Sequence, residues 1–387
     1  MLTRLRFKNW RSLRDVEIDN LTPLTVFIGA NSAGKSNILD ALYFLRECSE
    51  HGVVRAVQER GGVQKIHTLR TPRQDPIEIE FTYRNSVHAS LLSYTLTLVF
   101  EDEMLPRIIE VLKDDAGRVY MESDSAGGGN IYLDFGQVQR LPVSEWEQTM
   151  LASFGPAPIY AQLHQTFQYI TQRWQLLDEN FLPPQSLPTG VSGDLMVIDR
   201  CADNVPLMLD FLHKVEPSLY AELQADLKWL LAHVATLETE SDDRETRFFI
   251  REGSSQDQEA PTISAGTVRL VAILTAYHVL NFKSRAQMAG LVVVEEPDTA
   301  LNPWLLSRFV EQLRNYVDRE YLRQFILTTH NPRLLDHFQP EEVRIVQRDE
   351  RGYTTVERVP EYIRDIWLDE YGLGQVWSTG SLGAAAQ

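Results

Sequence analysis

The residues Gly29-Ala30-Asn31-Ser32-Ala33-Gly34-Lys35-Ser36 match the pattern G-x-x-x-x-G-K-[ST] over its whole length. The apolar run 24–28 that precedes them predicts a buried strand, and residues 37–45 that follow carry apolar side chains at helical spacing. A strand, a glycine turn and a helix N-terminus together direct free backbone N–H groups and the helix dipole at an anion. The sequence therefore predicts a loop that holds the phosphates of a nucleotide.

Individual residues of this loop have distinct expected roles. Lys35 would reach the β- and γ-phosphates, and Ser36 would hold Mg²⁺. The other residues expected to surround the phosphates are Asn31, Ser32, Ala33, Gly34 and Asn37. An ordinary glycine-rich turn is the alternative, and the strand and helix on either side of the octet argue against it.

Two carboxylates follow a second apolar run, residues 291–294, which predicts another buried strand. Ligands of α/β sheets bind at the carboxyl ends of the strands, where Glu295 and Glu296 would lie. Glu295 would then stand near Mg²⁺, and Glu296 would orient or deprotonate the attacking water. A solvated strand end is the alternative interpretation.

A histidine ends the third such segment, because His330 follows the apolar run 325–327 by two threonines. His330 could hydrogen-bond the γ-phosphate or the water and so respond to the nucleotide state. A lone histidine is more often structural, but its place at a strand end beside the two earlier ones favours a functional role.

A serine and a glycine open the helix expected from residue 267. Ser264 or Thr267 could simply cap that helix. Alternatively, Ser264 and the bare backbone of Gly266 form a second anion site. Such a site is surplus within a subunit that already has a phosphate loop, so it would meet the γ-phosphate bound to a partner subunit.

Composition limits the remaining possibilities. The formal net charge of −17 argues against nonspecific nucleic-acid binding by the whole surface. One stretch is basic, either as a local patch or as a solvated face; it contains Arg55, Arg60, Lys65, Arg70 and Arg73. The two cysteines lie far apart and favour a reducing, cytoplasmic setting. The N-terminus does not resemble a signal peptide, and we expect no apolar run near the roughly 18 residues of a membrane helix, hence no membrane partner.

The rest of the chain predicts an α/β fold. Strands are expected within 1–29, 77–84, 94–100, 107–133 (broken at 114–117 and 126–129) and 247–250, and a hairpin at 343–358. Helices are expected at 144–170, 203–233 with a break near Pro217, 267–283 and 303–317, the third of them apolar almost all round and therefore buried. Residues 181–193 and 254–259 are expected to be loops.

The order of these motifs resembles the ABC-type ATPase heads of the SMC/RecF/OLD group, and in particular the AAA_21 family of RecF-like ATPases. Residues 5–12 resemble the opening strand and turn of that group, which implies that Arg11 and Ser12 lie near the adenine and the α-phosphate. Residues 264–270 resemble the signature loop, 295–303 the Walker B and D-loop block, and 328–332 the switch-histidine loop. Residues 372–377 resemble the C-terminus of the family.

The chain also departs from the group. The glutamine of the Q-loop cannot be placed, and the segment 150–154, its candidate position, contains no glutamine. Residues 105–190 are too short and lack the heptads of an SMC coiled coil. No acidic metal cluster typical of the nuclease domain of OLD proteins follows His330. We therefore expect an ATPase head with a small insertion.

The resemblance implies a P-loop fold with a mixed sheet lobe and a helical subdomain that carries the signature loop. Expected divisions are 1–104 with the phosphate loop, 105–190 as an insertion, 191–283 as the helical subdomain and 284–387 with the acidic strand end and His330. It further implies an ATP-hydrolysing, Mg²⁺-dependent head-to-tail homodimer.

Two outputs of such a cycle remain open. ATP-driven dimerisation could regulate or scaffold a separate effector protein, such as a nuclease in prokaryotic defence. Alternatively, the dimer could be an ATP-dependent clamp on DNA in repair or maintenance. The acidic composition favours the first, and the likeness to RecF favours the second.

Overall fold

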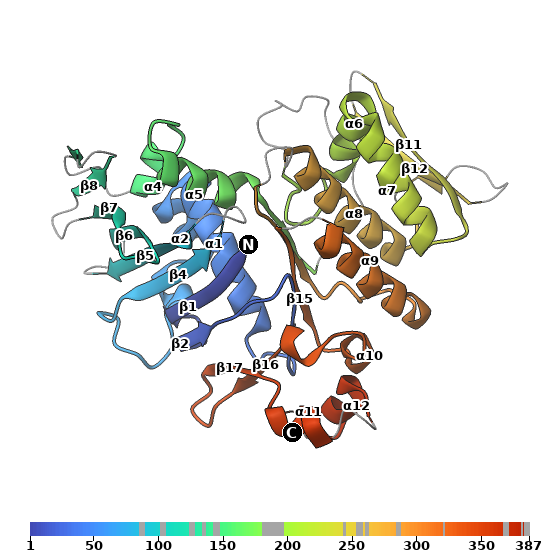
Figure 1. The fold of residues 1–387 in the computed structure, drawn as a ribbon. Coiled ribbons are helices and arrows are strands. Elements are labelled where there is room, and N and C mark those ends of the chain that lie inside the picture. Colours follow the sequence, from blue (N-terminus) through green and yellow to red (C-terminus); the bar gives the residue numbers. More distant parts are fainter. Residues whose placement is uncertain are drawn as a thin grey trace.

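The computed structural model describes residues 1–84, 90–100, 106–123, 128–133, 137–141, 148–179, 197–242, 245–252, 258–259, 263–283, 288–319, 322–366, 371–380 and 382. The loop predicted at 181–193, most of the loop at 254–259 and part of the turn at 126–129 lie outside these residues. Three sheets organise the described chain (Figure 1).

The central sheet has six strands in the order β10-β14-β15-β3-β16-β17. Its members are β3 (Leu24–Ile28), β10 (Trp174–Leu177), β14 (Gly290–Glu295), β15 (Arg323–Thr329), β16 (Val343–Arg348) and β17 (Thr354–Arg358). The first five run parallel, and β17 pairs antiparallel with β16. The predicted parallel strands at 291–294 and 325–327 and the hairpin at 343–358 are confirmed, whereas β10 was not predicted.

The second sheet has eight antiparallel strands in the order β2-β1-β4-β5-β6-β7-β8-β9. They are β1 (Leu2–Trp10), β2 (Leu13–Ile18), β4 (Ile77–Tyr83), β5 (Leu92–Phe100), β6 (Pro106–Asp114), β7 (Val119–Ser123), β8 (Gly129–Tyr132) and β9 (Val138–Leu141). Alternating side chains of β5 are buried, as the period of two in its sequence predicts. Only β9 was not foreseen.

Helix α1 (Lys35–His51) packs against this antiparallel sheet, where Phe44 meets Trp10 with ring centroids 4.7 Å apart. Two short helices, α2 (Val53–Glu59) and α3 (Val63–Ile66), follow it. The prediction of a single helix over residues 144–170 is wrong. The structure has α4 (Met150–Phe154) and α5 (Ala161–Gln172), because Gly155, Pro156 and Pro158 interrupt the helical pattern.

Helices cover the other side of the central sheet: α6 (Val205–Val215), α7 (Pro217–Leu230), α8 (Ala265–Lys283) and α9 (Leu306–Arg319) (Figure 1). The break at Pro217 is confirmed. The predicted helix runs too far, since β11 (Val234–Ser241) follows and pairs with β12 (Thr246–Glu252), which in turn pairs with β13 (Gln258–Glu259).

Helix α8 corrects one expectation from composition. Its window Ala265–Phe282 is long and apolar enough to cross a membrane by length and hydropathy, but 83% of that window is buried inside the protein. This burial confirms the prediction of a core helix.

The central sheet separates two hydrophobic cores. On one face Phe27, Val293 and Ile326 join the core shared with α1 and the antiparallel sheet. On the other face Val26 and Val294 join the core of α8 and α9. Because both faces are apolar, the polar side chains of these strands lie toward their ends: Glu295 and Thr328 at the carboxyl edge, and Arg323 and Gln324 at the other edge.

Short elements complete the C-terminal part: η4 (Pro303–Leu305), α10 (Pro332–Leu335), η5 (Pro340–Glu342), α11 (Glu361–Ile366) and α12 (Leu373–Ser378). Helix α12 packs closely against α10, because a Cβ at Gly374 would lie 1.9 Å from the Pro332 carbonyl oxygen. Only glycine therefore fits at this contact.

Candidate functional site

The predicted phosphate loop connects β3 to α1 at the carboxyl edge of the central sheet. Gly34 precedes the first helical residue with φ 117°, and no side chain caps the helix. A Cβ at Gly34 would lie 2.1 Å from Thr354 Oγ1 and 3.0 Å from Ser12 Oγ. The first amides of α1 thus remain available to an anion, and glycine is required for both conformation and space.

Lys35 folds back over its own loop. Its Nζ donates to the carbonyl oxygens of Gly29 at 2.8 Å and Ala30 at 3.3 Å, and it lies 3.9 Å from Glu296 Oε1. Burial lowers the pKa of Lys35, although the charges of Glu296 and Glu295 oppose this shift. The loop therefore contains a buried ammonium group whose present partners are two carbonyls and a distant carboxylate.

Glu295 ends β14 next to Ser36. Burial raises the pKa of the Glu295 carboxyl, and the nearby Ser36 hydroxyl acts in the opposite direction. A hydroxyl and a carboxylate near one another are the oxygen ligands that Mg²⁺ takes beside substrate phosphates. Within the described ranges no three His, Cys, Asp or Glu side chains could hold a metal together. The residues fit a Mg²⁺ ion that completes its shell with phosphate oxygens and water.

Glu296 has a strained backbone, and a histidine and a lysine lie near its carboxylate. Its φ is 48°, a left-handed conformation that costs a non-glycine residue about 1–3 kcal/mol. Its N–H donates to the carbonyl oxygen of Thr328 at 3.1 Å. Its carboxylate lies 2.8 Å from His330 Nδ1 and 3.9 Å from Lys35 Nζ.

Burial raises the pKa of the Glu296 carboxyl, while His330 and Lys35 act in the opposite direction. The side chain of His330 is 55% exposed, so it closes the outer side of this cluster. The arrangement brings the sequence-predicted Lys35, Glu296 and His330 together. A carboxylate placed in this way can accept a proton from a water molecule beside the phosphate loop.

The signature segment lies against the turn that follows Glu296. A Cβ at Gly266 would lie 2.4 Å from the Ala300 carbonyl oxygen, so this glycine serves a contact within the chain. Ser264 Oγ accepts the Thr267 N–H at 3.2 Å and thus caps α8, as the simpler interpretation holds. Ser264 is nevertheless exposed at the surface. Its side chain could face a second molecule without leaving the helix.

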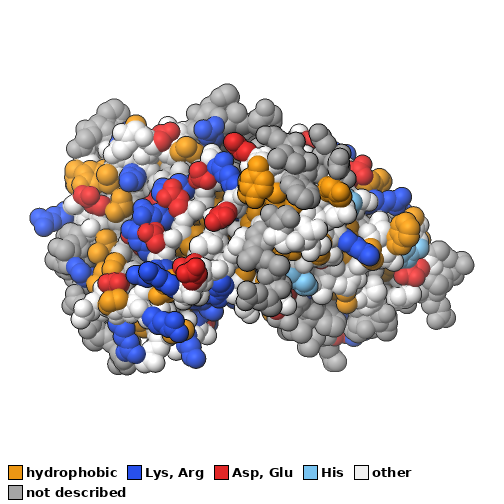
Figure 2. Space-filling view, turned by 90° about the horizontal axis from the view of Figure 1, so that it is seen from below, with side chains coloured by type: hydrophobic (Ala, Val, Ile, Leu, Met, Phe, Trp, Pro, Cys, Tyr) orange, Lys and Arg blue, Asp and Glu red, His pale blue; other side chains and the backbone are white. Residues whose placement is uncertain are grey.

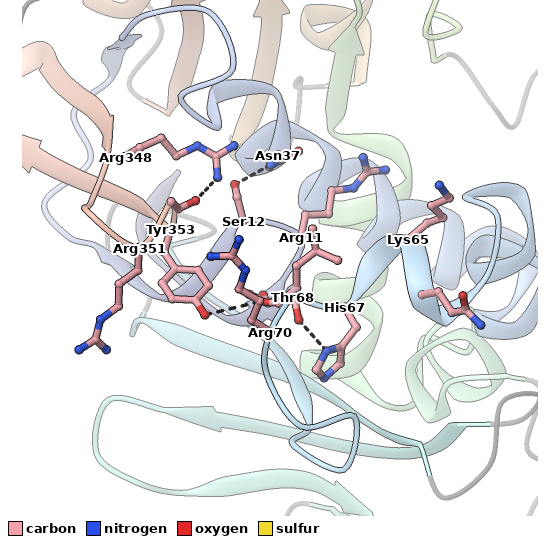
Figure 3. Close-up of a pocket in the computed structure, with 13 residues that line it drawn as sticks. Arg11, Ser12, Asn37, Lys65, His67, Thr68, Arg70, Arg348, Arg351 and Tyr353 are labelled. Atoms are coloured by element: carbon pink, nitrogen blue, oxygen red, sulfur yellow. Dashed lines mark hydrogen bonds between the residues drawn. The ribbon is translucent and has the colours of Figure 1, made fainter. Parts of the chain in front are cut away.

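A cavity of about 530 Å³ lies beside the phosphate loop (Figure 3). Arg11, Ser12 and Asn37 are among the residues that line it. Asn37 Nδ2 donates to Ser12 Oγ at 2.6 Å, and Arg11 Nε lies 2.8 Å from Asp40 Oδ2. The cavity therefore reaches the first turn of α1.

The rest of the lining comes from two distant segments: Gln64, Lys65, His67, Thr68, Leu69 and Arg70, and Arg348, Arg351, Gly352 and Tyr353. None of the lining residues is acidic. Arg348 Nε also donates to the Ser32 carbonyl oxygen at 2.9 Å, which ties β16 to the phosphate loop. A cationic lining of this size suits an anionic ligand such as part of a nucleotide.

Within the basic stretch 55–73, some residues fit the interpretation of a local basic patch and others do not. Lys65 and Arg70 line the cavity, whereas Arg55 pairs with Glu59 at the surface. Arg60 is buried in ion pairs with Asp40 and Glu47. Figure 2 shows Lys and Arg side chains interspersed with Asp and Glu over much of the left half of the face shown.

Sequence analysis missed the end of β10. The register with β14 places Asp178 and Glu179 just beyond Leu177, beside Glu295. The negative charges of both residues contribute to raising the pKa of the Glu295 carboxyl. The segment 150–154, the candidate position of the Q-loop, forms helix α4, whose first amides donate to Glu110 of β6. The signal that could have revealed β10 was an apolar Leu-Leu pair followed by two acids.

The parallel sheet, the phosphate loop and the acidic strand end define a P-loop ATPase head of the ABC/SMC type. The model of the family described as "AAA domain, putative AbiEii toxin, Type IV TA system" (AAA_21) matches residues 24–336. The chain belongs to this family.

Similar proteins support this class. An OLD nuclease of Thermus scotoductus is 24% identical over 93% of this chain and 65% of its own length. An ATP/GTP phosphatase of Helicobacter pylori is 35% identical over 17% of this chain and 18% of its own. A DNA replication and repair protein RecF of Bacteroides thetaiotaomicron is 42% identical over 13% of this chain and 14% of its own length. The chain spans less than two thirds of each of these relatives.

A solved structure shows the same fold. The crystal structure of the SmcHead bound to the C-winged helix domain of ScpA superposes with a TM-score of 0.62 at 13% identity. The match covers 94% of this chain and 99% of that one. The expected fold, an ABC/SMC-type head with a mixed sheet lobe and a helical subdomain, is confirmed.

Proposed function

We propose that this protein binds and hydrolyses ATP with Mg²⁺ at the carboxyl edge of the central sheet. The observation that carries the proposal is the meeting of Lys35, Glu296 and His330 at the mouth of a phosphate loop. The triphosphate would lie on the first amides of α1, and the sugar and base would occupy the cavity that Arg11 and Ser12 line.

Each residue has a defined task in this reaction. Lys35 leaves its two carbonyl partners and pairs with the β- and γ-phosphates, where its charge stabilises the transition state. Glu296 accepts the proton of the attacking water, and His330 orients the Glu296 carboxylate through Nδ1. Ser36 and Glu295 would hold Mg²⁺, which supplies charge neutralisation at the phosphates when bound.

The active form in this proposal is a head-to-tail homodimer in the cytoplasm. Ser264 and Gly266 at the start of α8 would face the γ-phosphate held by the partner subunit, and Ser264 is exposed in a position that allows it. The divisions 1–104, 105–190, 191–283 and 284–387 remain our proposal for the parts of the chain. Because β5 pairs with β6 and β3 pairs with β15 across their borders, they would not move as separate bodies when ATP closes the dimer.

We further propose that the dimer regulates a separate effector protein, with a nuclease in prokaryotic defence as the leading candidate. The alignment with the OLD nuclease spans 65% of that protein, and the family description names a toxin system. A DNA clamp is the second candidate, favoured by the RecF relatives.

Light scattering of purified protein, with and without ATP and Mg²⁺, tests the dimer, and phosphate release tests hydrolysis. A dimer that forms with ATP and opens after hydrolysis is the expected result. If the molecular mass does not change when ATP is added, Ser264 does not contribute to the site of a partner subunit. If no phosphate is released, the protein does not hydrolyse ATP. Filter binding of DNA at low salt with ATP separates the two outputs.

A further inference from the structure

One buried arginine connects the start of α8 to the candidate catalytic turn. Arg269 is 5% exposed, and its guanidinium donates to the backbone carbonyls of Glu296 and Glu179. It lies three residues after Gly266, on the same face of the helix. Gly266 contacts Ala300 at the far end of the turn 296–300. The first turns of α8 therefore contact both ends of this turn.

The peptide groups of Glu296 are thus held from two sides. Its N–H donates to the Thr328 carbonyl and hydroxyl oxygens of β15, and its carbonyl accepts from Arg269 of α8. A residue at φ 48° keeps that conformation only where its surroundings fix it. The direction of the Glu296 carboxylate toward His330 and Lys35 depends on this backbone conformation.

We infer that Arg269 is a positioning residue that holds the Glu296 carboxylate in its productive orientation and links it to the helix bearing Ser264. The two arms of its guanidinium reach two different strand ends, β14 through Glu296 and β10 through Glu179. Movement of α8 is transmitted to Glu296 through these bonds. This inference rests on the proposed hydrolysis at Glu296 and adds to it a residue that does not touch ATP.

Arg173 offers a matched control at the opposite end of α8. It is 2% exposed and also donates to backbone carbonyls, namely those of Leu280, Met288 and Ala289. An Arg173→Met change therefore removes the same kind of buried interaction without touching the turn at Glu296.

The test compares Arg269→Met, Arg269→Lys and Arg173→Met with the wild type in three measurements: melting temperature, affinity for a fluorescent ATP analogue, and kcat across pH. We expect Arg269→Met to lower kcat at least about tenfold with analogue affinity within about twofold, since a small misplacement of a catalytic group has a large effect on rate. The acidic limb of the kcat–pH profile of Arg269→Met should also shift relative to that of the wild type. Arg269→Lys should restore kcat only partly, because an ammonium group lacks the fork that reaches both carbonyls.

Arg173→Met should lower the melting temperature but keep kcat within about threefold. Equal kcat losses in Arg173→Met and Arg269→Met, or unchanged kcat in the latter, would overturn the inference. If Arg269→Met does not fold, Arg269→Gln, which retains a donor, is compared with Arg173→Gln by the same criteria. A wild type that binds the analogue but releases no phosphate contradicts the proposed function itself, so the two failures are distinguishable.

Discussion

Replacing Glu296 by glutamine isolates the role of its charge. The carboxylate lies 2.8 Å from His330 Nδ1 and 3.9 Å from Lys35 Nζ, and an amide of nearly equal size keeps the packing. Loss of a general base costs about 10²- to 10⁴-fold in rate, so kcat of Glu296→Gln should fall within that range. Steady-state phosphate release measures kcat.

The same change should strengthen ATP binding. At 3.9 Å and an effective dielectric of about 20, the attraction between Lys35 and Glu296 is roughly 4 kcal/mol before solvation is counted. If a third of this becomes available to the γ-phosphate, affinity rises about tenfold. Titration with a fluorescent ATP analogue and light scattering should show a tighter nucleotide complex that remains dimeric.

The pH dependence has a definite sign. Burial raises the pKa of Glu296, so the wild type loses its base as pH falls through that raised value, and kcat should decline there. The ionised carboxylate correspondingly destabilises the fold at neutral pH, because a raised folded-state pKa contributes stability only at lower pH. Glu296→Gln should lack the acid limb and melt at a higher temperature than the wild type at pH 7.

Glu342→Gln is the control for Glu296→Gln. Glu342 is buried and paired with Arg314 away from the loop, so its loss should lower the melting temperature and leave kcat unchanged. Wild-type turnover in Glu296→Gln, or an equal loss in both variants, would refute the assignment of Glu296 as the base.

Three further predictions concern the loop, the metal and the dimer. Gly34→Ala, with φ 117° and a Cβ 2.1 Å from Thr354 Oγ1, should abolish analogue binding, whereas Gly117→Ala, also at positive φ but in open space, should cost only about 1 kcal/mol in denaturant unfolding. Glu295→Gln should raise the Mg²⁺ concentration for half-maximal phosphate release at least about tenfold, and an unchanged Mg²⁺ titration would contradict its role. Trp304→Ser, at a residue 89% exposed beside the turn 296–300, should weaken the ATP-dependent dimer in light scattering without changing the melting temperature, and unaltered dimerisation would place the interface elsewhere.

Local sequence patterns predicted the parts of the fold that depend on local order. The octet at 29–36 and the apolar runs before Glu295 and His330 indicated three strands of the central sheet, since each continuous apolar run adjoins a recognisable glycine-rich or polar motif. Strand β10 has only four residues and pairs with β14 more than a hundred residues later. No local pattern records such a pairing, so Asp178 and Glu179 were not placed at the site.

The basic stretch shows a second limit. Arg60 and Lys65 lie close in sequence and have the same charge, yet one is buried in ion pairs and the other lines the cavity. The difference arises from Asp40 and Glu47 of α1, which lie seven residues apart, two helical turns, and face α2. Tertiary pairing decides which cations remain available, and a single sequence does not specify it. The carbonyl contacts of Arg269 were beyond sequence reasoning for the same reason.

The position of β3 has a consequence for the synthesis of the protein. The strand that leads into the phosphate loop lies between β15 and β16, and the backbone of Leu2 is hydrogen-bonded by the side chain of Gln324. While a ribosome is still translating the first 320 residues, β3 has neither of its neighbours, and its edge stays open to other chains. The nucleotide site therefore matures only near the end of translation, and truncation before β15 should give an aggregation-prone product that binds no ATP.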